Sequence, residues 1–513
     1  MAITRNELLK LQNGSDVRGV ACEGIEGESV TLTSEAAYLI GQAFAIWLLK
    51  KKNIEPKECI IGVGMDSRIT GPEIKKQTIK GILSQGVYVS DCGLASTPAM
   101  FMSIVYPETR YDGACMITAS HLPFNRNGLK FFDPDGGLEH DDITAILEIA
   151  ASQAESFSAD VLAAPLPTDD NRFCEFDLIS LYSANLCMKI CDAVNADDYD
   201  QPLKGLKIVV DAGNGAGGFF ADKVLKELGA DISGSSFLEP DGTFPNHIPN
   251  PENKTAMKAI CDSTVKNHAD LGLIFDTDVD RMSAVLSDGT PINRDSIIAM
   301  ISAILAPDFP GSTIITDSVT SDRLTDFLEK ELGLKHLCYM RGYKNVINKC
   351  KELNAAGTVS PLAMETSGHG CLKENYYLDD GAFLAVKLVI AVAKAATDGK
   401  NIDHLIEKLD TKYVDREVRF PIHAEDFKLY GASVLDEFKK RAELSGFELP
   451  VSHEGIRIRF RDVCTGWMLL RASLHDPVMV LNLEGRTEKD LEIITGIAQS
   501  LIEGFEKLDF SAL

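Results

Sequence analysis

Three aspartates at alternate positions directly follow an apolar segment in the middle of the chain. Leu271–Phe275 precedes Asp276, Asp278 and Asp280, and Arg281 comes next. Like charges a few ångströms apart repel by up to about 4 kcal/mol per pair at an effective dielectric constant near 20, and a bound hard cation removes that cost. Because oxygen-only ligands suit Mg²⁺, the pattern favours a magnesium site over a solvated acidic turn. A calcium EF-hand loop is disfavoured, since its sixth position would be Arg281 rather than glycine.

A second polar loop contains a serine with basic residues close by in the sequence. Ser120 follows the apolar residues 114–117, His121 comes directly after it, and Lys130 lies ten positions further on. A serine at the end of a strand acts as a nucleophile or phosphoryl carrier when a base or a metal activates it. The same residues also suit a helix cap. Hydrolase chemistry is less attractive, because the G-x-S-x-G elbow is absent.

A third loop presents three polar side chains at alternate positions. Glu365, Ser367 and His369 follow residues 361–364. In extended backbone such residues point to one side, where one acceptor and two donors would meet sugar hydroxyls. A capping serine and a histidine satisfied within the protein are the alternative.

A fourth loop combines an arginine with a hydroxyl. Arg471 and Ser473 follow the apolar residues 467–470, and His475 comes two positions later. Arginine binds an oxyanion through two parallel N–H groups, so the loop is a plausible phosphate clamp. An R-x-S sequence is common, and it is weak evidence by itself.

The segments that carry these loops predict an α/β protein. Apolar periodicity predicts a helix over residues 34–51, with Ser34 as its N-cap. Short apolar runs alternate with helical segments, as in α/β folds, and active sites of such folds form beyond the carboxyl ends of strands. The strand-like runs are residues 60–63, 114–117, 208–210, 271–275, 313–315, 361–364 and 467–470.

Length and pattern together predict several domains. At 513 residues the chain exceeds what one core usually organises. We expect three related α/β domains with mixed sheets and a smaller C-terminal α+β domain, arranged around a central cleft. The predicted ranges are 1–160 with the serine loop, 161–292 with the metal loop, 293–410 with the sugar loop and 411–513 with the phosphate loop.

Two other interpretations match the sequence literally. Residues 213–218 fit G-x-G-x-x-G, but Asp211 would face a pyrophosphate unfavourably, so we interpret these glycines as a strand-to-helix turn. Residues 271–279 also fit an aspartyl-phosphate phosphatase, with Asp276 as nucleophile. That interpretation leaves Ser120 and the loop of residues 365–369 without a function.

Composition excludes several classes of partner. A formal net charge of -25 disfavours nucleic acid and anionic membranes, which require a basic surface. The twelve cysteines never form C-x-x-C, which disfavours zinc and thioredoxin-like chemistry. With no signal peptide and no apolar run long enough to cross a membrane, we expect reduced thiols and a cytoplasmic location.

The four loops, in this order and spacing, resemble those of the α-D-phosphohexomutases, the family of phosphoglucomutase and phosphomannomutase. The similarity runs nearly end to end. It includes residues 14–19, 63–68, 97–98, 209–218, 241–245 and 453–457.

The resemblance implies a role for each matching residue. Ser120 would be the phosphoserine, and it would ligate one Mg²⁺ per chain together with Asp276, Asp278 and Asp280. Sugar and phosphate binding would fall to Glu365, Ser367, His369, Arg471, Ser473 and His475. The remaining active-site residues would be Arg18, His121, Lys130 and Arg281.

The implied reaction interconverts hexose 1-phosphate and hexose 6-phosphate, with glucose or mannose as the sugar, through a hexose 1,6-bisphosphate. Either Lys130 or His121 would be the general base. The expected partners are small sugar phosphates, and the expected assembly is a monomer or a homodimer.

Several residues depart from the family pattern. The phosphate loop has Leu474, His475 and Asp476 where a small residue followed by Thr-Glu-Pro is usual, Leu122 stands where Asn is common, and Met364 replaces a glycine. Two alternatives therefore stay open, namely a phosphoglucosamine mutase and a sugar-phosphate sensor that has lost turnover.

Overall fold

The computed structural model describes residues 3–473, 476–511 and 513. The chain divides into two compact units, and one short segment of the second half belongs with the first unit. Unit 1 comprises residues 1–292 and 378–402, and unit 2 comprises residues 293–377 and 403–513.

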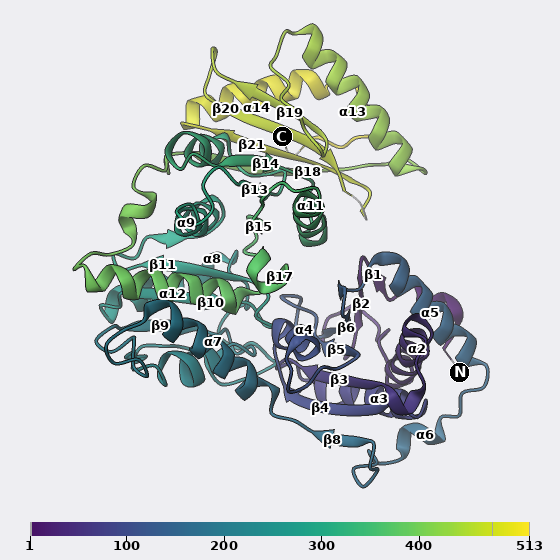
Figure 1. Ribbon diagram of the computed structural model, residues 1–513. Helices are drawn as coiled ribbons and strands as arrows, with labels where there is room; N and C mark the ends of the chain where they lie inside the picture. Colours follow the sequence, from purple (N-terminus) through teal and green to yellow (C-terminus); the bar gives the residue numbers. More distant parts are fainter. Residues whose placement is uncertain (1–2, 474–475, 512) are drawn as a thin grey trace. The chain divides into compact units, whose positions relative to one another are not determined.

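The first sheet of unit 1 is mixed and has the order β1-β2-β6-β5-β3-β4-β8 (Figure 1). The short strand β7 pairs with β6. Strands β5, β3, β4 and β8 are parallel to one another, whereas β6 is antiparallel to β5. The strands are β1 (Gln12–Asn13), β2 (Asp16–Val20), β3 (Ile60–Met65), β4 (Tyr88–Leu94), β5 (Gly113–Ile117), β6 (Arg126–Asp133), β7 (Gly136–Gly137) and β8 (Phe173–Glu175).

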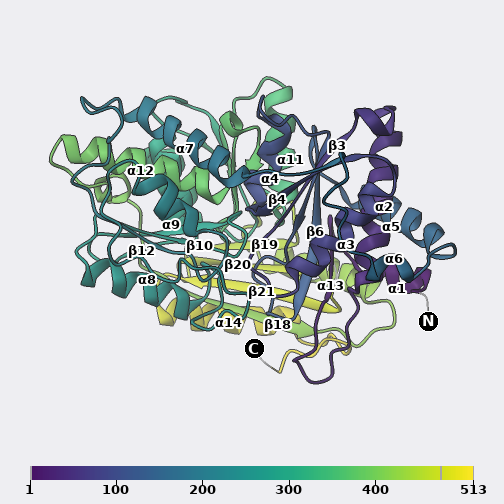
Figure 2. The same cartoon turned by 90° about the horizontal axis from the view of Figure 1, so that it is seen from below.

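Helices cover both faces of this sheet. Figure 2 shows α2, α3 and α5 gathered on one side, where their apolar residues form one core with β3, β5 and β6. Helix α4 packs on the other face, where Phe101 meets Phe132 edge to face with ring centroids 5.9 Å apart. The helices are α1 (Arg5–Leu9), α2 (Ser34–Lys52), η1 (Pro56–Glu58), α3 (Gly71–Leu83), α4 (Thr97–Val105), α5 (His140–Ala154) and α6 (Asp160–Ala163).

The second sheet of unit 1 has the order β12-β11-β10-β9. Its strands are β9 (Ile208–Asp211), β10 (Leu271–Phe275), β11 (Met282–Leu286) and β12 (Pro291–Ile292). Helix α8 (Lys254–Lys266) buries Ala256, Met257 and Ile260 against it. Helix α12 (Gly381–Thr397) contacts β10 and β11, so this late segment completes an early sheet. Unit 1 also contains α7 (Leu178–Val194), η2 (Phe220–Leu225) and β17 (Leu378–Asp379).

Unit 2 contains a third sheet in which β14, β13 and β15 are parallel and β16 is antiparallel to β15. Helix α11 packs Val346 and Cys350 against Ile315 and Ala363 of this sheet. The elements are α9 (Asp295–Leu305), β13 (Thr313–Thr316), α10 (Asp322–Asp326), η3 (Phe327–Glu331), β14 (Lys335–Cys338), α11 (Tyr343–Ala355), β15 (Leu362–Met364), β16 (Gly370–Leu372), η4 (Lys373–Asn375) and η5 (Asp403–Ile406).

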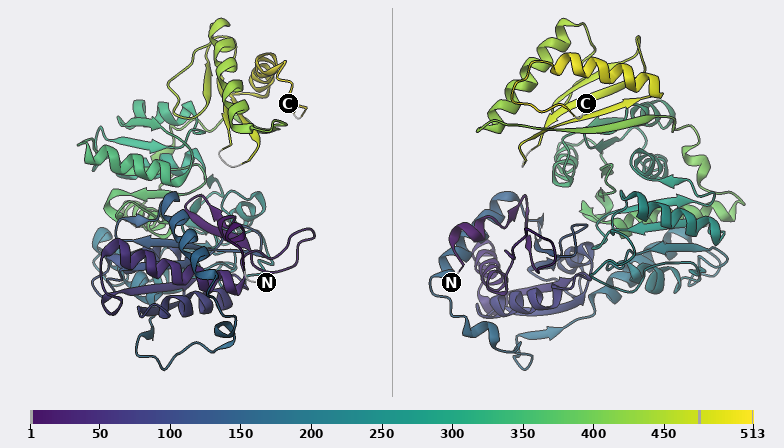
Figure 3. Two further views of the ribbon diagram at one scale, coloured as in Figure 1. Left: turned by 90° about the vertical axis from the view of Figure 1, so that its right-hand side faces the viewer. Right: turned by 180° about the vertical axis from the view of Figure 1, so that it is seen from behind.

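The C-terminal part of unit 2 is an antiparallel sheet in the order β18-β21-β20-β19. Figure 3 shows α13 and α14 on one side of it, and their apolar faces share a core with the sheet. The elements are β18 (Val414–Pro421), α13 (Phe427–Leu444), β19 (Ile456–Phe460), β20 (Gly466–Ala472), β21 (Val478–Gly485) and α14 (Glu488–Ile502).

The predicted fold class is confirmed, since three mixed α/β sheets precede an α+β sheet. One prediction within it is wrong. Thr33 rather than Ser34 is the N-cap of α2, because its side chain accepts the N–H of Ala36 and Ser34 is already helical. Both residues are good caps, so composition did not separate them. Within the described residues, no helix is both long and apolar enough to span a bilayer.

Candidate active site

The three aspartates predicted as metal ligands lie together in the loop between β10 and β11. Asp276, Asp278 and Asp280 are each at most 1% exposed. Their ligand oxygens all lie within 4.8 Å of one another. The loop turns sharply because Val279 has a positive φ of 68°, an uncommon conformation for a β-branched residue. The sequence therefore concentrates three acidic groups in a buried turn.

Ser120 lies beside this turn, as the sequence predicted. It follows β5, and its hydroxyl donates to Oδ2 of Asp276 at 3.0 Å. Its backbone φ is 49°, in the left-handed region that few residues other than glycine adopt. The hydroxyl and the carboxylates, 156 positions apart along the chain, thus converge within unit 1.

Arg281 connects the serine and the carboxylates. Its Nη2 donates to Oγ of Ser120 at 2.9 Å and to Oδ2 of Asp276 at 3.0 Å. Burial alone would lower the pKa of Arg281, but the carboxylates of Asp276, Asp280 and Asp278 raise it above its ordinary value. The guanidinium therefore stays charged beside the serine hydroxyl.

His121 is exposed and contacts both Arg281 and Ser120. Nη2 of Arg281 lies 2.6 Å from its Nδ1, and Oγ of Ser120 lies 3.3 Å from the same atom. Because a guanidinium only donates, Nδ1 accepts, and a neutral ring then carries its proton on Nε2.

The other two predicted basic residues also lie in unit 1, on neighbouring strands. Nζ of Lys130, on β6, donates to Oδ2 of Asp280 at 2.8 Å. Arg18, on β2, pairs with Asp16 at 2.8 Å and donates to the carbonyl of Thr118, two residues before the serine. Lys130 thus touches the aspartate triad, whereas Arg18 touches the serine loop.

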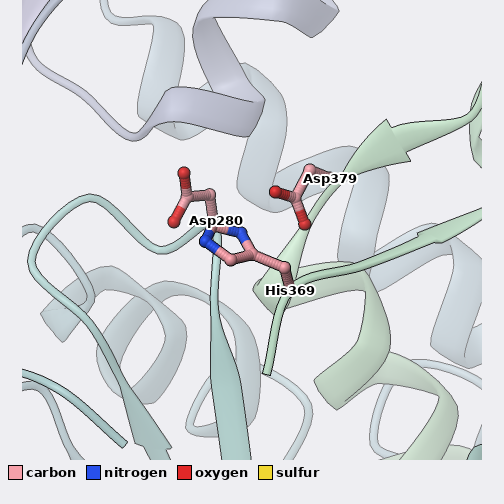
Figure 4. Close-up of side chains that lie close together, drawn as sticks. All are labelled: Asp280, His369 and Asp379. Carbon is pink, nitrogen blue, oxygen red and sulfur yellow. The ribbon is translucent and has the colours of Figure 1, made fainter. Parts of the chain in front are cut away.

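Two residues around the triad were missed by the sequence analysis. Thr97, the first residue of α4, donates its hydroxyl to Oδ2 of Asp278 and its backbone N–H to the carbonyl of Asp278 at 2.9 Å. Asp379 offers a carboxylate oxygen within 4.8 Å of one of Asp280 (Figure 4). The sequence analysis noted the Thr-Pro pair at 97–98 only as a segment similar to the family. Nothing in the Asp-Asp-Gly sequence at 379–381 indicated that Asp379 lies close to Asp280.

In unit 2 the predicted sugar loop is a buried turn between β15 and β16. Oε1 of Glu365 accepts the N–H of Gly342 at 2.6 Å, and the N–H of Glu365 donates to the carbonyl of His369 at 2.8 Å. Burial, followed by the carboxylate of Asp317, raises the pKa of Glu365 to about 7. The ring of His369, also labelled in Figure 4, stacks on Tyr343 with centroids 5.3 Å apart. Oγ of Ser367 has no hydrogen-bond partner among the described residues.

The predicted phosphate loop begins at the end of β20, also in unit 2. An Nη1–Oε1 distance of 3.6 Å separates Arg471 from Glu454. Within the described part of the chain, Nε of Arg471 has no hydrogen-bond partner. Oγ of Ser473 accepts the N–H of Asp476 at 3.2 Å. His475 lies outside the described residues.

The donor set of the aspartate loop suits a hard divalent cation. Three buried carboxylates lie around one point, and Oδ1 of Asp278 has no hydrogen-bond partner in the described ranges. Burying a carboxylate oxygen without a partner costs free energy, and a cation that binds this oxygen removes the cost. The residues present therefore fit Mg²⁺.

Comparison with known proteins identifies relatives along most of the chain. Models of the α/β/α domains I, II and III of phosphoglucomutase/phosphomannomutase match residues 10–157, 189–289 and 293–413. A phosphomannomutase/phosphoglucomutase of Pseudomonas syringae pv. tomato is 30% identical over 94% of this chain and 92% of its own length. A phosphoglucomutase of Neisseria meningitidis serogroup B is 30% identical over 95% of both.

Solved structures show the same fold. A phosphoglucomutase/phosphomannomutase family protein of Burkholderia thailandensis superposes with a TM-score of 0.77 at 24% identity, covering 99% of this chain and 100% of its own. The pp63/parafusin phosphoglucomutase of Paramecium superposes with a TM-score of 0.70 at 16% identity, covering 96% of this chain and 95% of its own.

The domain matches and the end-to-end relatives confirm the predicted resemblance. The chain belongs to the phosphoglucomutase/phosphomannomutase family, within the α-D-phosphohexomutases.

Proposed function

We propose that this protein is a phosphohexomutase that interconverts the 1-phosphate and 6-phosphate of glucose or mannose through a phosphoserine at position 120. One observation carries the proposal. The hydroxyl of Ser120 lies 3.0 Å from a carboxylate of a buried aspartate triad and 2.9 Å from a buried guanidinium. The named relatives, phosphomannomutases and phosphoglucomutases, support this choice of sugar over glucosamine.

Asp276, Asp278 and Asp280 would hold one Mg²⁺, together with Oγ of Ser120 or an oxygen of its phosphoryl group. When bound, the cation would neutralise negative charge on the phosphoryl oxygens. Their burial and the unpaired Oδ1 of Asp278 support this assignment.

The transfer itself exchanges one phosphate ester for another. A hydroxyl of the bound hexose phosphate attacks the phosphorus on Ser120, its new P–O bond forms as the bond to Oγ breaks, and its proton passes to a base. In the return step Oγ attacks the other phosphate of the resulting hexose 1,6-bisphosphate, the bond from that phosphorus to the sugar oxygen breaks, and the proton given up by Oγ passes through the base to the sugar oxygen. Arg281 donates to Oγ and would stabilise charge on the oxygens in flight.

Lys130 and His121 are the two candidates for the base. Lys130 is the ammonium partner of Asp280, so it becomes a base only after losing a proton. His121 is exposed, and its accepting Nδ1 already contacts Arg281. A comparison of pH profiles for Lys130→Met and His121→Gln would rank them.

Binding of the sugar and of its non-reacting phosphate falls to unit 2. Glu365, Ser367 and His369 would bind hydroxyls, and Arg471 with Ser473 would clamp the phosphate. His475 stays a predicted contact. Ser367 and Arg471 each have a buried polar atom with no partner in the described chain, which supports a ligand role for both loops.

The first test is to trap the phosphoenzyme. Wild-type protein incubated with glucose 1,6-bisphosphate should gain one phosphoryl group on Ser120, seen by peptide mass spectrometry, and this group should resist hydroxylamine. Ser120→Ala should lower mutase turnover by about 10⁴-fold or more, because no carrier remains. A hydroxylamine-labile phosphate on Asp276 would instead support the phosphatase interpretation.

A substrate panel tests the choice of sugar. Coupled assays with the 1-phosphates of glucose, mannose and glucosamine should show turnover with the first two. Exclusive turnover of the glucosamine phosphate would favour a phosphoglucosamine mutase. Binding of all three without turnover would favour a sensor.

The predicted location, partners and oligomeric state are compatible with this function but do not test it. A cytoplasmic location, sugar phosphates as the only partners and a monomeric or homodimeric state all stay predictions. Fractionation of cells and light scattering of the purified protein would check them.

A further inference from the structure

A second buried arginine, Arg68, lies behind the serine loop and takes no part in the proposed chemistry. It follows β3 in the segment Gly-Met-Asp-Ser-Arg, and the whole residue is 1% exposed. Burying a guanidinium costs several kcal/mol unless its N–H groups are satisfied. The partners of this side chain therefore show what it does.

All the hydrogen bonds found for the Arg68 guanidinium go to backbone carbonyls of the loop that carries Ser120 and of the first residue of β6. Nη1 donates to the carbonyls of Pro123 at 2.8 Å and Arg126 at 2.9 Å. Nη2 donates to the carbonyls of Leu122 at 2.7 Å and Ser120 itself. Four carbonyls within residues 120–126 thus converge on one planar cation.

This loop has little regular structure of its own between β5 and β6. It contains two turns, closed by Leu122 N–H to Ala119 and Arg126 N–H to Pro123, and Ser120 is in the left-handed region with a φ of 49°. Strained backbone of this kind persists only where the surroundings fix it. The Arg68 fork supplies that constraint from the buried side of the loop.

Arg68 is itself held by its own segment and by one other segment of unit 1. Asp66 accepts the backbone N–H of Arg68 at 3.0 Å, and its carboxylate lies 3.6 Å from Nε of the same arginine. The ring of Phe244 lies over the guanidinium at 5.3 Å. Gly242 packs so closely on the Arg68 backbone that a Cβ there would lie 2.4 Å from the carbonyl of Ser67. Residues 64–68 and 241–245, both conspicuous in the sequence, therefore meet at this arginine.

We infer that Arg68 is a positioning residue for the phosphoryl carrier, and this inference rests on the proposed function of Ser120. Arg68 contacts the carbonyl oxygen of Ser120, whereas Arg281 and Asp276 contact its hydroxyl. Arg68 thus fixes where Oγ lies without touching the reacting atoms. Lysine has the charge but not the planar fork that reaches four carbonyls at once.

The test compares Arg68→Lys with wild type in mutase kinetics. We expect kcat to fall about 10²-fold, since a displacement of about 1 Å in a reacting group has that effect. KM should change less than about threefold, because sugar binding is assigned to other loops. For Arg68→Ala, guanidinium well below denaturing concentration should restore part of kcat, and the same concentration of sodium chloride should not.

Arg172→Lys is the matched control, because Arg172 also donates to a backbone carbonyl, that of Leu83, but lies away from the serine loop. Its kcat should equal that of wild type. Thermal unfolding of each variant shows whether it is folded. If Arg68→Lys does not fold, Phe244→Leu tests the inference in its place. This variant removes only the ring over the guanidinium, and its kcat should be several-fold lower than that of wild type.

Wild-type kcat in a folded Arg68→Lys enzyme would overturn the inference, as would wild-type kcat in Phe244→Leu where Arg68→Lys fails to fold. Both results leave the phosphoserine intact. By contrast, failure of the proposed function appears in the wild-type enzyme itself, as absent turnover or absent phosphate on Ser120.

Discussion

Hydrogen bonding differs between the polar groups around Ser120, in unit 1, and those of the two binding loops, in unit 2. In unit 1, Arg281 bonds both Ser120 and Asp276, and Lys130 bonds Asp280. In unit 2, Oγ of Ser367 and Nε of Arg471 are buried without a partner among the described residues. The unpaired Oδ1 of Asp278 in unit 1 belongs to the predicted metal site, whereas the unpaired atoms of the two loops in unit 2 are hydrogen-bond donors.

This difference separates two tasks. Charges that already hold one another in place need no rearrangement when a phosphoryl group is transferred, which is how preorganised sites lower barriers. Buried polar atoms without partners cost free energy until a ligand pairs with them. We therefore expect substitutions in unit 1 to act mainly on kcat and substitutions in unit 2 to act mainly on KM.

The largest effect should come from Asp278→Asn, which removes one charge from the triad at its unpaired oxygen. We expect kcat to fall by about 10³-fold or more and the affinity for Mg²⁺ to fall with it, because a neutral amide is a poorer ligand for a hard cation. Steady-state kinetics and calorimetric titration with Mg²⁺ measure the two. Asp262→Asn, on the exposed surface of α8, is the control and should change neither. Unchanged metal affinity in Asp278→Asn would contradict the assignment of the triad.

The lesson for sequence analysis is that local patterns were predictable, whereas long-range contacts were predicted only where the family resemblance implied them, as for Ser120 and Asp276. The apolar run of β10 followed by alternating aspartates indicated a buried acidic turn, because strand and ligands are adjacent in the chain. Thr97 bonds Asp278 across 181 positions, and nothing in the sequence near either residue specifies the other.

Two further contacts show the same limit. The Arg68 fork binds main-chain carbonyls, which every residue has, so no pattern of side chains predicts it. Helix α12 lies in unit 1, although residues 293–377 and 403–513, which flank its segment 378–402, lie in unit 2. A strongly apolar sequence indicates that a helix is buried, but it does not indicate which sheet the helix covers.

A smaller effect, now on binding, should follow from Arg471→Lys. The change keeps the charge but loses the two parallel donors that grip a phosphate, so KM should rise about 10-fold to 100-fold while kcat changes less. The control is Arg461→Lys, whose side chain is 66% exposed and pairs with Glu448 in the same part of the chain. An effect confined to kcat would contradict our inference that substitutions in unit 2 act mainly on KM.

The smallest effect should be on stability, through Glu365→Gln. The pKa of Glu365 is raised to about 7 from an ordinary 4.5, first by burial and then by Asp317. The folded protein therefore holds a proton at this carboxyl that the unfolded chain releases, so the wild type loses stability as pH rises from about 4.5 to about 7. Glutamine has no proton to lose and should avoid that loss.

At pH 8 the free energy of unfolding of Glu365→Gln should exceed that of wild type by on the order of 2 kcal/mol, and the gain should vanish near pH 4.5. Thermal unfolding at both pH values measures this difference. Glu443→Gln, whose side chain is 56% exposed on α13, is the control and should show no pH-dependent gain. A gain for Glu365→Gln that is equal at both pH values would mean that packing, rather than the buried charge, sets the stability of the sugar loop.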